Sequence, residues 1–347
     1  MSDASSVLSA PHAAPAGAFM GRRPRGAFLL DEPSFEVVYG PEEVRAISEL
    51  VDLPSSPLLL RRTAVESGAL QDVEVLFSGW GMIPIDEAFL AAAPRLKAVF
   101  YAAGAVRYFV TDAFWKRNIA LTAAHAVNAI PVAEYALGAI LLSLKHFWKM
   151  AAGTRNGMEW GDHRRIVPGG FRSTVGIVSV GMISTRLIEL LKPFDLRVIA
   201  YCPFLTEEKA ARLGVERGSL ERIFACSDVV SIHTPVLPET IGLIDGRLIG
   251  SMKEGATLVN TARGAVINEP EMVEVLRRRP DLTAVLDVCD PEPPPPGSPV
   301  TVLPNVVLTP HIAGSLGPEC RRLGHVMMQE LRRYLAGEPL RWRITRE

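Results

Sequence analysis

The chain has 347 residues, 48% of them hydrophobic, and a formal net charge of −1 at pH 7. That length and composition are enough for two domains with packed cores, and the near-neutral charge gives no reason to expect nucleic acid or an anionic membrane as a partner. The longest apolar stretch, residues 135–144, is too short to cross a bilayer, so we expect no transmembrane helix. The four cysteines lack metal-ligand spacing, which favours reduced thiols in a cytoplasmic protein without a metal site.

Residues 1–25 are rich in Ala, Ser, Pro and Gly. No amphipathic helix fits between these prolines and glycines, so we expect a disordered tail. The alternative is a targeting segment, because Arg22, Arg23 and Arg25 end the stretch and acidic residues are scarce.

From Gly26 onward, short apolar runs alternate with stretches of helical periodicity. Apolar runs at 28–30 and 35–39 come before a helical stretch at 41–51. The next expected elements are a strand at 73–78, a helix at 85–93, and strands at 96–101 and 119–122. Such alternation predicts a parallel sheet, whose ligands gather at the carboxyl ends of the strands. The glycine-containing turns 78–81 and 102–105 therefore either offer N–H groups to an anionic substrate or are ordinary strand-to-helix turns.

A long helix is expected after Asn128, with Pro131 in its first turn, where the missing N–H of proline is no loss. The helix is rich in Ala and Leu on nearly all sides, so we expect it to be buried between domains or subunits. A loop over 153–170 then leads to the central unit of the chain.

Residues 174–203 read as strand, tight turn, helix and strand, which is the βαβ unit of a dinucleotide-binding fold. In that fold the pyrophosphate lies at the helix N-terminus, and a G-x-G-x-x-G turn allows its close approach. Here only Gly181 of the three glycines survives, since Ser179 and Ser184 stand at the other two positions, and Cys202 replaces the expected acidic residue. Alone, the pattern fits any βαβ unit with a glycine in its turn.

Three later strand ends each deliver a polar residue: Arg263, Glu292 and His311. Reduction of a carbonyl by a nicotinamide needs a proton donor at the oxygen, which histidine supplies, and a carboxylate on the other ring nitrogen fixes the tautomer and stabilises the cation. Arginine binds carboxylate and carbonyl oxygens as a fork. Taken singly, each residue could instead be a solvated surface charge or make a simple structural hydrogen bond. Because all three follow neighbouring strands, a catalytic role is favoured.

Several motifs together resemble the D-2-hydroxyacid dehydrogenase family over roughly residues 70–335. The motifs are Val127-Asn128-Ala129 with Val132-Ala133-Glu134, His233-Thr234-Pro235 with Pro238-Glu239-Thr240, Asn260-Thr261-Ala262-Arg263-Gly264, Leu286-Asp287-Val288 with Pro291-Glu292-Pro293, and Thr309-Pro310-His311-Ile312-Ala313-Gly314. The resemblance implies an NAD(P)-dependent oxidoreductase that transfers a hydride between the dinucleotide and a 2-oxo or D-2-hydroxy acid. It implies that His311 is the acid/base, Glu292 its partner, and Arg263 the residue that binds the substrate carboxylate and carbonyl.

The resemblance also implies binding residues. For substrate, the expected residues are Gly79, Trp80, Ala103, Gly104, Arg107 and Asn128. For the dinucleotide, they are Ser179, Gly181, Met182, Ile183, Cys202, Thr234, Pro235, Thr240, Thr261, Ala262, Asp287, His311, Ala313 and Gly314. Arg107 stands where the family usually has an acidic residue, so it either holds a second anionic group of the substrate or is a solvated charge.

The implied fold class is α/β, with two Rossmann-like, doubly wound parallel-sheet domains and a cleft between them. A substrate domain (26–124 plus 315–347) would surround a dinucleotide-binding domain (125–314), and the helix after Pro131 resembles the family's dimerisation element.

Because Cys202 neither binds the ribose strongly nor repels a 2′-phosphate, and residues 203–207 hold no cation, we expect weak discrimination between NAD and NADP. The alternative function is a corepressor-like, dinucleotide-sensing protein with little activity, which the eroded glycine turn favours and the intact Arg/Glu/His set does not.

Overall fold

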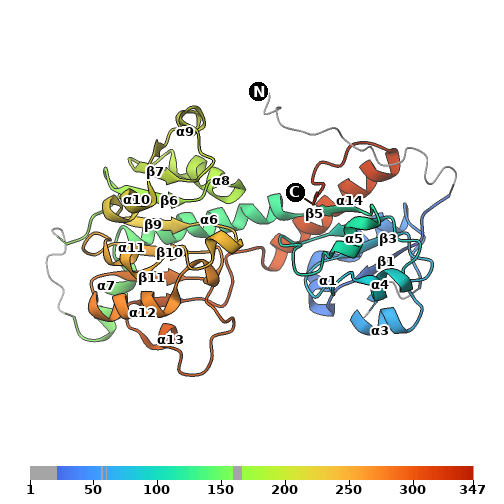
Figure 1. Cartoon of the computed structure of the whole chain (residues 1–347), viewed down its shortest axis with the longest axis horizontal. Helices are drawn as coiled ribbons and strands as arrows, with labels where there is room; N and C mark the ends of the chain where they lie inside the picture. The colour runs from blue at the N-terminus through green and yellow to red at the C-terminus, as the bar shows by residue number, and fades with distance from the viewer. Residues whose placement is uncertain (1–21, 56–57, 60, 159–165, 347) are drawn as a thin grey trace. The chain divides into compact units, whose positions relative to one another are not determined.

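The computed structural model of the chain describes residues 22–55, 58–59, 61–158 and 166–346. The chain divides into two compact units (Figure 1): unit 1 runs up to Asn128 and resumes at Leu316, and unit 2 is Ala129–Ser315. Of the expected N-terminal tail, residues 1–21 lie outside the described residues, whereas residues 22–25 contact the sheet of unit 1.

Unit 1 is built on one parallel sheet, in the strand order β2-β1-β3-β4-β5. Its strands are β1 (Gly26–Leu29), β2 (Leu58–Leu59), β3 (Val75–Ser78), β4 (Ala98–Tyr101) and β5 (Ala120–Ala123). Its helices are α1 (Glu32–Val38), α2 (Pro41–Ser48), α3 (Arg61–Glu66), α4 (Glu87–Ala92), α5 (Asp112–Lys116) and α14 (Cys320–Ala336), preceded by η3 (Gly317–Glu319). Alternate strand residues face opposite cores: Phe77 and Phe100 pack with α1 and α14, whereas Leu76 and Val99 pack with α4 and α5.

The apolar run 35–39 belongs largely to helix α1. Asp31 caps this helix by accepting a hydrogen bond from the Ser34 N–H at 2.8 Å, and a proline occupies its first turn. Both features start a helix. A run of five residues is too short for its periodicity to identify a helix.

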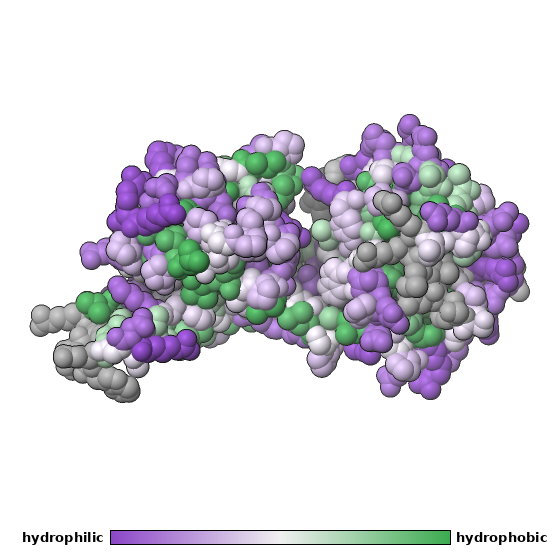
Figure 2. Space-filling model, turned by 90° about the horizontal axis from the view of Figure 1, so that it is seen from below, coloured by the Kyte–Doolittle hydropathy of each residue, from purple (hydrophilic) through white to green (hydrophobic). Residues whose placement is uncertain are grey.

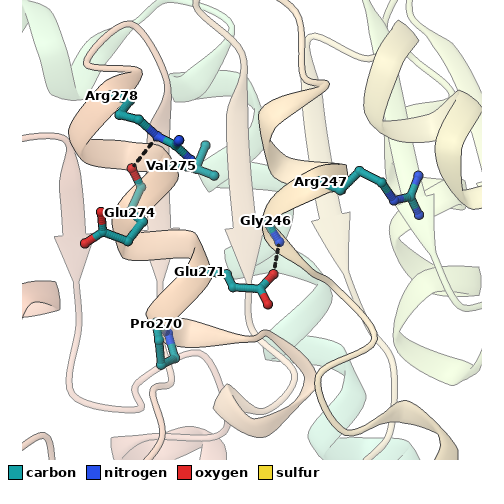
Figure 3. Close-up of a pocket in the computed structure, with 7 residues that line it drawn as sticks. All are labelled: Gly246, Arg247, Pro270, Glu271, Glu274, Val275 and Arg278. Carbon is teal, nitrogen blue, oxygen red and sulfur yellow. Dashed lines mark hydrogen bonds between the residues drawn. The ribbon is translucent and has the colours of Figure 1, made fainter.

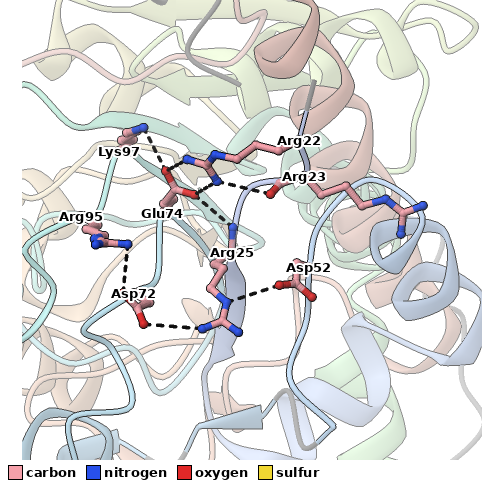
Figure 4. A network of polar contacts seen from close by, with 8 residues as sticks. All are labelled: Arg22, Arg23, Arg25, Asp52, Asp72, Glu74, Arg95 and Lys97. Atoms are coloured by element: carbon pink, nitrogen blue, oxygen red, sulfur yellow. Dashed lines mark hydrogen bonds and ion pairs between the residues drawn. The ribbon is translucent and has the colours of Figure 1, made fainter. Parts of the chain in front are cut away.

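A buried carboxylate, Glu74, lies at the amino ends of the strands of this sheet and binds the segment that precedes β1 (Figure 4). Glu74, whose side chain is only 5% exposed, accepts hydrogen bonds from both Nη atoms of Arg22, from Lys97 Nζ and from the Arg25 N–H. The Arg22 hydrogen bonds, more than any other contact, lower the pKa of Glu74 to about 2. The contacts tie the segment 22–25 to the strand that follows Glu74.

We expect Glu74→Gln to lower the free energy of unfolding by about 3 kcal/mol at pH 7. The folded-state pKa lies below the ordinary value of 4.5, so this stability is present above pH 4.5 and disappears as the pH falls toward 2. Urea titrations over this range should therefore show wild type and variant converging in acid. Asp72→Asn, which removes a half-exposed carboxylate paired with Arg95, is the control and should change stability by less than about 1 kcal/mol. Equal losses in both variants would contradict the assignment.

Unit 2 contains a larger parallel sheet, in the strand order β12-β11-β10-β9-β6-β7-β8. Its strands are β6 (Thr174–Val178), β7 (Arg197–Tyr201), β8 (Glu216–Arg217), β9 (Val229–Ile232), β10 (Thr257–Asn260), β11 (Thr283–Leu286) and β12 (Val306–Leu308). Its helices are α6 (His125–Ser143), whose first four residues belong to unit 1, α7 (Phe147–Arg155), α8 (Met182–Leu191), α9 (Glu207–Leu213), α10 (Leu220–Cys226), α11 (Gly246–Gly250), α12 (Glu269–Arg278) and α13 (Pro299–Val302), with short η1 (Pro238–Thr240) and η2 (Gly264–Val266). Helices α6, α8 and α9 share one core with Val229 and Val259, and α10, α11 and α12 share the other with Val230 and Leu258. The predicted α/β fold with two doubly wound parallel sheets is confirmed.

Helix α6 begins at His125, so Pro131 lies inside the helix and not in its first turn as predicted. By length and composition alone it could cross a membrane, and it is the one such helix among the described residues. However, 44% of its most apolar window is buried. Ala133, Ala136 and Ile140 pack in the core of unit 2, as expected of a core helix.

Several short elements were not expected from the sequence, among them α7, α9 and β8. Helix α7 continues to Arg155, inside the stretch interpreted as a loop, part of which (159–165) lies outside the described residues. Helix α9 and the two-residue strand β8 follow β7, and both are too short to give a clear period.

Polar residues cover most of the face drawn in Figure 2, and hydrophobic residues show there as separate patches, as is normal for a globular surface.

Candidate active site

The strand order of unit 2 reverses at β6, with β7 and β8 on one side and β9 to β12 on the other. In open α/β sheets, ligands bind at the carboxyl ends of the strands at such a switch point. The residues predicted to be catalytic and those predicted to bind the dinucleotide follow β6, β7, β9, β10, β11 and β12. The topology therefore places both sets at the carboxyl ends of the strands of one sheet, which we call the carboxyl edge.

His311 and Glu292 form a hydrogen-bonded pair at this edge. The distance from His311 Nδ1 to Glu292 Oε1 is 2.5 Å, and the two side chains are 45% and 40% exposed. Because the carboxylate only accepts, Nδ1 carries a proton, and Nε2 is the ring nitrogen left to exchange a proton with a reactant. The backbone of His311 has φ of +56°, a conformation that costs free energy and is concentrated at functional sites.

Asp287 holds the loop that carries His311. The side chain is 1% exposed, and its oxygens accept hydrogen bonds from Thr309 Oγ1 at 2.6 Å, from the Ile312 N–H at 2.8 Å and from the Ala313 N–H at 2.8 Å. Tyr135 of α6 donates its hydroxyl to Thr309 Oγ1 at 2.9 Å, and burial raises the pKa of this phenol, so it is a neutral donor. Asp287, which the resemblance assigned to the cofactor, thus bonds chiefly to the chain itself.

The turn after β10 carries Arg263. Asn260 shapes the turn by accepting the Ala262 N–H and donating to the Arg263 carbonyl, each at 3.0 Å. The guanidinium of Arg263 is exposed, and its Nη1 donates to the Ala262 carbonyl at 2.6 Å. Gly264 follows, and a Cβ at this position would lie 2.1 Å from the backbone of Cys289. Only glycine permits the turn after β10 to press against the chain that leaves β11.

The turn after β6 holds the residues predicted to bind the phosphates of the dinucleotide. Ser179 has φ of +76°, and a Cβ on Gly181 would have no atom within 4 Å, so the backbone there is open to a ligand. The Gly181 N–H donates to Ser184 Oγ at 2.8 Å, and Ser184 is fully buried. The first-turn N–H groups of Met182 and Ile183 are not used within α8, and at this positive helix end they suit an anion.

Ser179 and Ser184 both replace glycines of the fingerprint, but we expect opposite effects when glycine is restored. Ser179→Gly should raise stability by about 1 kcal/mol, because glycine adopts a positive φ without strain. Ser184→Gly should lower stability by about 1–2 kcal/mol, because it removes the hydrogen bond to Gly181 and places glycine within a helix. Thermal unfolding of the two variants tests this, and shifts of the same sign would contradict the structural account.

Two buried hydroxyl groups support a ligand at this edge. Thr234, after β9, and Thr261, after β10, are 4% and 7% exposed, and neither Oγ1 has a hydrogen-bond partner among the described residues. Burial lowers the pKa of the neighbouring His233 to about 4, so its ring is neutral, and Nε2 lies 3.0 Å from Ser231 Oγ. Buried polar groups are normally paired, so two unpaired hydroxyls after the neighbouring strands β9 and β10 fit a polar ligand such as a dinucleotide.

The remaining predicted dinucleotide residues differ in accessibility. Thr240 Oγ1 donates to the Pro235 carbonyl at 2.7 Å and accepts a hydrogen bond from the Leu237 N–H. Its hydroxyl therefore stabilises the loop in which it lies. Cys202 is a half-buried free thiol at the end of β7, and Pro235 is exposed. Ala262, Ala313 and Gly314 complete the set, and the two alanines are buried.

The predicted substrate residues lie in unit 1, after β3, after β4 and at the start of α6. Gly79 is buried, Trp80 packs against both cores of unit 1, and Ala103 is buried beside Gly104. A Cβ on Gly104 would lie 3.8 Å from Asn128 Nδ2, so these two residues are neighbours. Arg107 is exposed.

A cavity of about 470 Å³ lies elsewhere in unit 2, between α11 and α12 (Figure 3). It is lined by Gly246, Arg247, Pro270, Glu271, Glu274, Val275 and Arg278. None of these is a predicted site residue, and the cavity belongs to the helical layer and not to the strand ends. We therefore assign it no part in the candidate active site.

Sequence reasoning missed three residues that shape the site. Tyr135 and Thr309 form the hydrogen bonds behind Asp287, although Thr309 stands within a motif that was noted. Ser184 was interpreted only as a lost glycine, whereas it accepts the Gly181 N–H. The sequence contains no clear signal for this bond, because the usual capping box has Glu or Gln, not Ser, at the third helical position.

Comparison with known proteins shows which family the chain resembles. A family model described as D-isomer specific 2-hydroxyacid dehydrogenase, NAD binding domain, matches residues 137–313. D-3-phosphoglycerate dehydrogenase of Archaeoglobus fulgidus is 30% identical over 258 residues, 74% of this chain and 49% of that protein. Glyoxylate reductase of Korarchaeum cryptofilum is 31% identical over 259 residues, 74% of this chain and 78% of that protein.

The chain spans about half the length of the phosphoglycerate dehydrogenases that it matches. The apo structure of D-mandelate dehydrogenase from Rhodotorula graminis has the same fold, with a TM-score of 0.76, 23% identity, and coverage of 94% of this chain and 98% of that one. The family model covers unit 2 almost completely, and the glyoxylate reductase is matched over most of its length. The chain therefore belongs to the D-isomer specific 2-hydroxyacid dehydrogenase family.

Proposed function

We propose that the chain is an NAD(P)-dependent oxidoreductase that interconverts a 2-oxo acid and a D-2-hydroxy acid. The observation that carries the proposal is the His311–Glu292 pair at 2.5 Å, one strand end away from an exposed arginine, in a chain of this family. The relatives named above, a phosphoglycerate dehydrogenase and a glyoxylate reductase, support the same class of reaction.

The residues divide the chemistry between them. When bound, the nicotinamide supplies or accepts the hydride at C2 of the substrate. In reduction His311 Nε2–H donates a proton to the carbonyl oxygen, and in oxidation the neutral nitrogen accepts it from the hydroxyl. Glu292 keeps the proton on Nδ1 and stabilises the imidazolium. Arg263 binds the substrate carboxylate through its planar fork.

The residues around β6, β9 and β10 would hold the dinucleotide. The open turn at Gly181 and the first turn of α8 suit the pyrophosphate, and Thr234 and Thr261 offer unpaired hydroxyls. Gly79, Trp80, Ala103, Gly104, Arg107 and Asn128 are proposed as substrate contacts. Their arrangement after parallel strands of unit 1 supports this role.

We also propose a homodimer built on α6 and a cytoplasmic location. Apolar side chains on and after α6 stay exposed in the single chain, among them Leu142 at 38% and Phe147 at 45%, which supports association with a second copy. All four cysteines are free, which is the state of thiols in a reducing compartment. Light scattering at micromolar concentration should give the mass of a dimer, and a monomer would contradict this part of the proposal.

The function is tested by following absorbance at 340 nm with NADH or NADPH and a panel of 2-oxo acids. Oxidation of the dinucleotide by one or more 2-oxo acids supports the proposal, provided that it depends on His311. Binding of dinucleotide without turnover of any acid would favour the corepressor-like alternative. A chain that binds neither dinucleotide would overturn both.

A further inference from the structure

We infer that Arg217, on the edge strand β8, binds the 2′-phosphate of NADP and that the chain prefers NADP to NAD. The inference rests on the proposed function, because it concerns the dinucleotide site at the switch point. It differs from the sequence-based expectation of weak discrimination, since residues 203–207 contain no cation but the fold brings one beside them.

The strand register places Arg217 next to the end of β7. β8 pairs with β7 in parallel, with Ile199 opposite Glu216 and Ala200 opposite Arg217. Paired residues project to the same face of a sheet, and so do residues two apart on one strand. Arg217 therefore shares a face with Ala200 and with Cys202, and Cys202 packs partly against the same core as Ala200. With about 3.3 Å rise per residue and about 4.8 Å between strands, the Cβ atoms of Arg217 and Cys202 lie roughly 8 Å apart.

That separation leaves room for a phosphate between the two side chains. In this fold the adenosine ribose lies at the end of the second strand of the βαβ unit, where an acidic residue selects NAD and a nearby arginine accommodates the 2′-phosphate of NADP. Cys202 occupies the acidic position and repels no phosphate. An arginine fork on the same face matches a phosphate dianion in charge and geometry.

The present partner of Arg217 is easily displaced. Its Nη1 lies 3.2 Å from Glu207 Oε1, and the two side chains are 48% and 79% exposed. Exposed ion pairs of this kind contribute little, with a median of about 0–1 kcal/mol. Glu207 begins helix α9, which packs on the Ala200 face, so this contact agrees with the face that the register assigns to Arg217.

The two other arginines near this edge of the sheet are held on the opposite face. Arg197 and Arg222 both bind Glu216, the residue opposite Ile199, at 2.5 Å and 3.0 Å. Ile199 packs in the core with α10, not in the core with Cys202. Arg197 also stands at the beginning of β7, so it is distant from the ribose position. Of these three arginines, Arg217 alone combines the correct face with the correct end of the strand.

Isothermal titration calorimetry with NADP, NAD, 2′,5′-ADP and 5′-AMP tests the assignment without relying on turnover. We expect wild type to bind NADP at least about tenfold more tightly than NAD, and 2′,5′-ADP more tightly than 5′-AMP. Arg217→Gln should weaken NADP and 2′,5′-ADP by about 10- to 100-fold and leave NAD within about twofold, because it removes charged hydrogen bonds to the phosphate only. Arg217→Lys should lie between wild type and Arg217→Gln, since it keeps the charge but not the fork.

Two further variants sharpen the result. Arg197→Gln is the matched control, an arginine 47% exposed on the same strand pair, and it should change neither affinity. Glu207→Gln should tighten NADP, because it removes the competing carboxylate. Equal weakening of NAD and NADP by Arg217→Gln, no weakening of either, or wild-type NAD binding at least as tight as NADP would each overturn the inference and leave the proposed function standing. Failure to bind any of the four probes would overturn both.

Discussion

Replacing His311 with alanine should lower kcat by about 10²–10⁴-fold, the typical contribution of a positioned acid/base, while the dissociation constant of the dinucleotide stays within about twofold. The reason is that Nε2 of His311 is the ring nitrogen left to exchange a proton once Glu292 holds Nδ1 at 2.5 Å. Steady-state kinetics with the best 2-oxo acid, together with a dinucleotide titration, measures the two effects separately.

The positive φ of His311 calls for a second variant. Alanine is strained at +56°, whereas asparagine adopts this conformation more readily, so His311→Asn removes the acid with less disturbance of the loop. Both variants should lose kcat to a similar extent. His325→Ala is the control, because His325 is exposed on α14 in unit 1 and should retain activity within about twofold. Full activity in His311→Asn would end the assignment of His311 as acid/base.

Glu292→Gln examines the same pair from the other partner. The carboxylate keeps the proton on Nδ1 of His311, whereas an amide can also present its N–H₂ group to the ring and so does not fix the tautomer. We therefore expect kcat to fall while the dissociation constant of the dinucleotide stays within about twofold. An unchanged kcat in steady-state kinetics would show that Glu292 has no part in the action of His311.

The placement of the Arg263, Glu292 and His311 motifs at one sheet edge could be predicted because it depends on a rule of topology. Carboxyl ends of parallel strands meet at one edge, so three polar residues after three such strands converge whatever their separation in the chain. Short alternations of apolar and helical segments were sufficient to recognise those strands. The same alternation identified β6 and the turn at Gly181.

What could not be predicted depends on contacts that local patterns do not contain. The hydrogen bond between Tyr135 and Thr309 joins residues 174 positions apart, on a helix and a strand end. Arg217 was missed for a similar reason, since a two-residue strand has no period and only its register reveals the neighbour. Ser179 and Ser184 looked alike as lost glycines, and only the backbone conformation and the cap distinguish them.

Asp287→Ala should cause the largest loss of stability among the substitutions considered, roughly 3–5 kcal/mol, because it removes the acceptor of three hydrogen bonds. The donors are the N–H groups of Ile312 and Ala313 and the Thr309 hydroxyl, which also lies 3.4 Å from the Leu286 carbonyl. Asp287 and Ala313 are buried, at 1% and 3% exposed. For a unit of this size, a loss of about 4 kcal/mol corresponds to a fall of about 8–16 °C in Tm. Activity should fall as well, since the same three bonds fix the loop that carries His311.

A series of three variants distinguishes the effect of the hydrogen bonds to Asp287 from the effect of losing a negative charge. In Asp287→Asn the amide oxygen can still accept from Thr309 and Ile312, which share one oxygen in the wild type, while the amide N–H₂ faces the Ala313 N–H. We therefore expect Asn to cost about 1–3 kcal/mol, one lost bond instead of three. Asp290→Ala is the control, an exposed carboxylate three residues along the chain, and it should change Tm by no more than about 2 °C. Differential scanning calorimetry of the three variants measures these differences in Tm. If Asp287→Ala and Asp290→Ala have the same Tm, the hydrogen bonds to Asp287 do not hold the loop. The positive φ of His311 must then be maintained by other contacts.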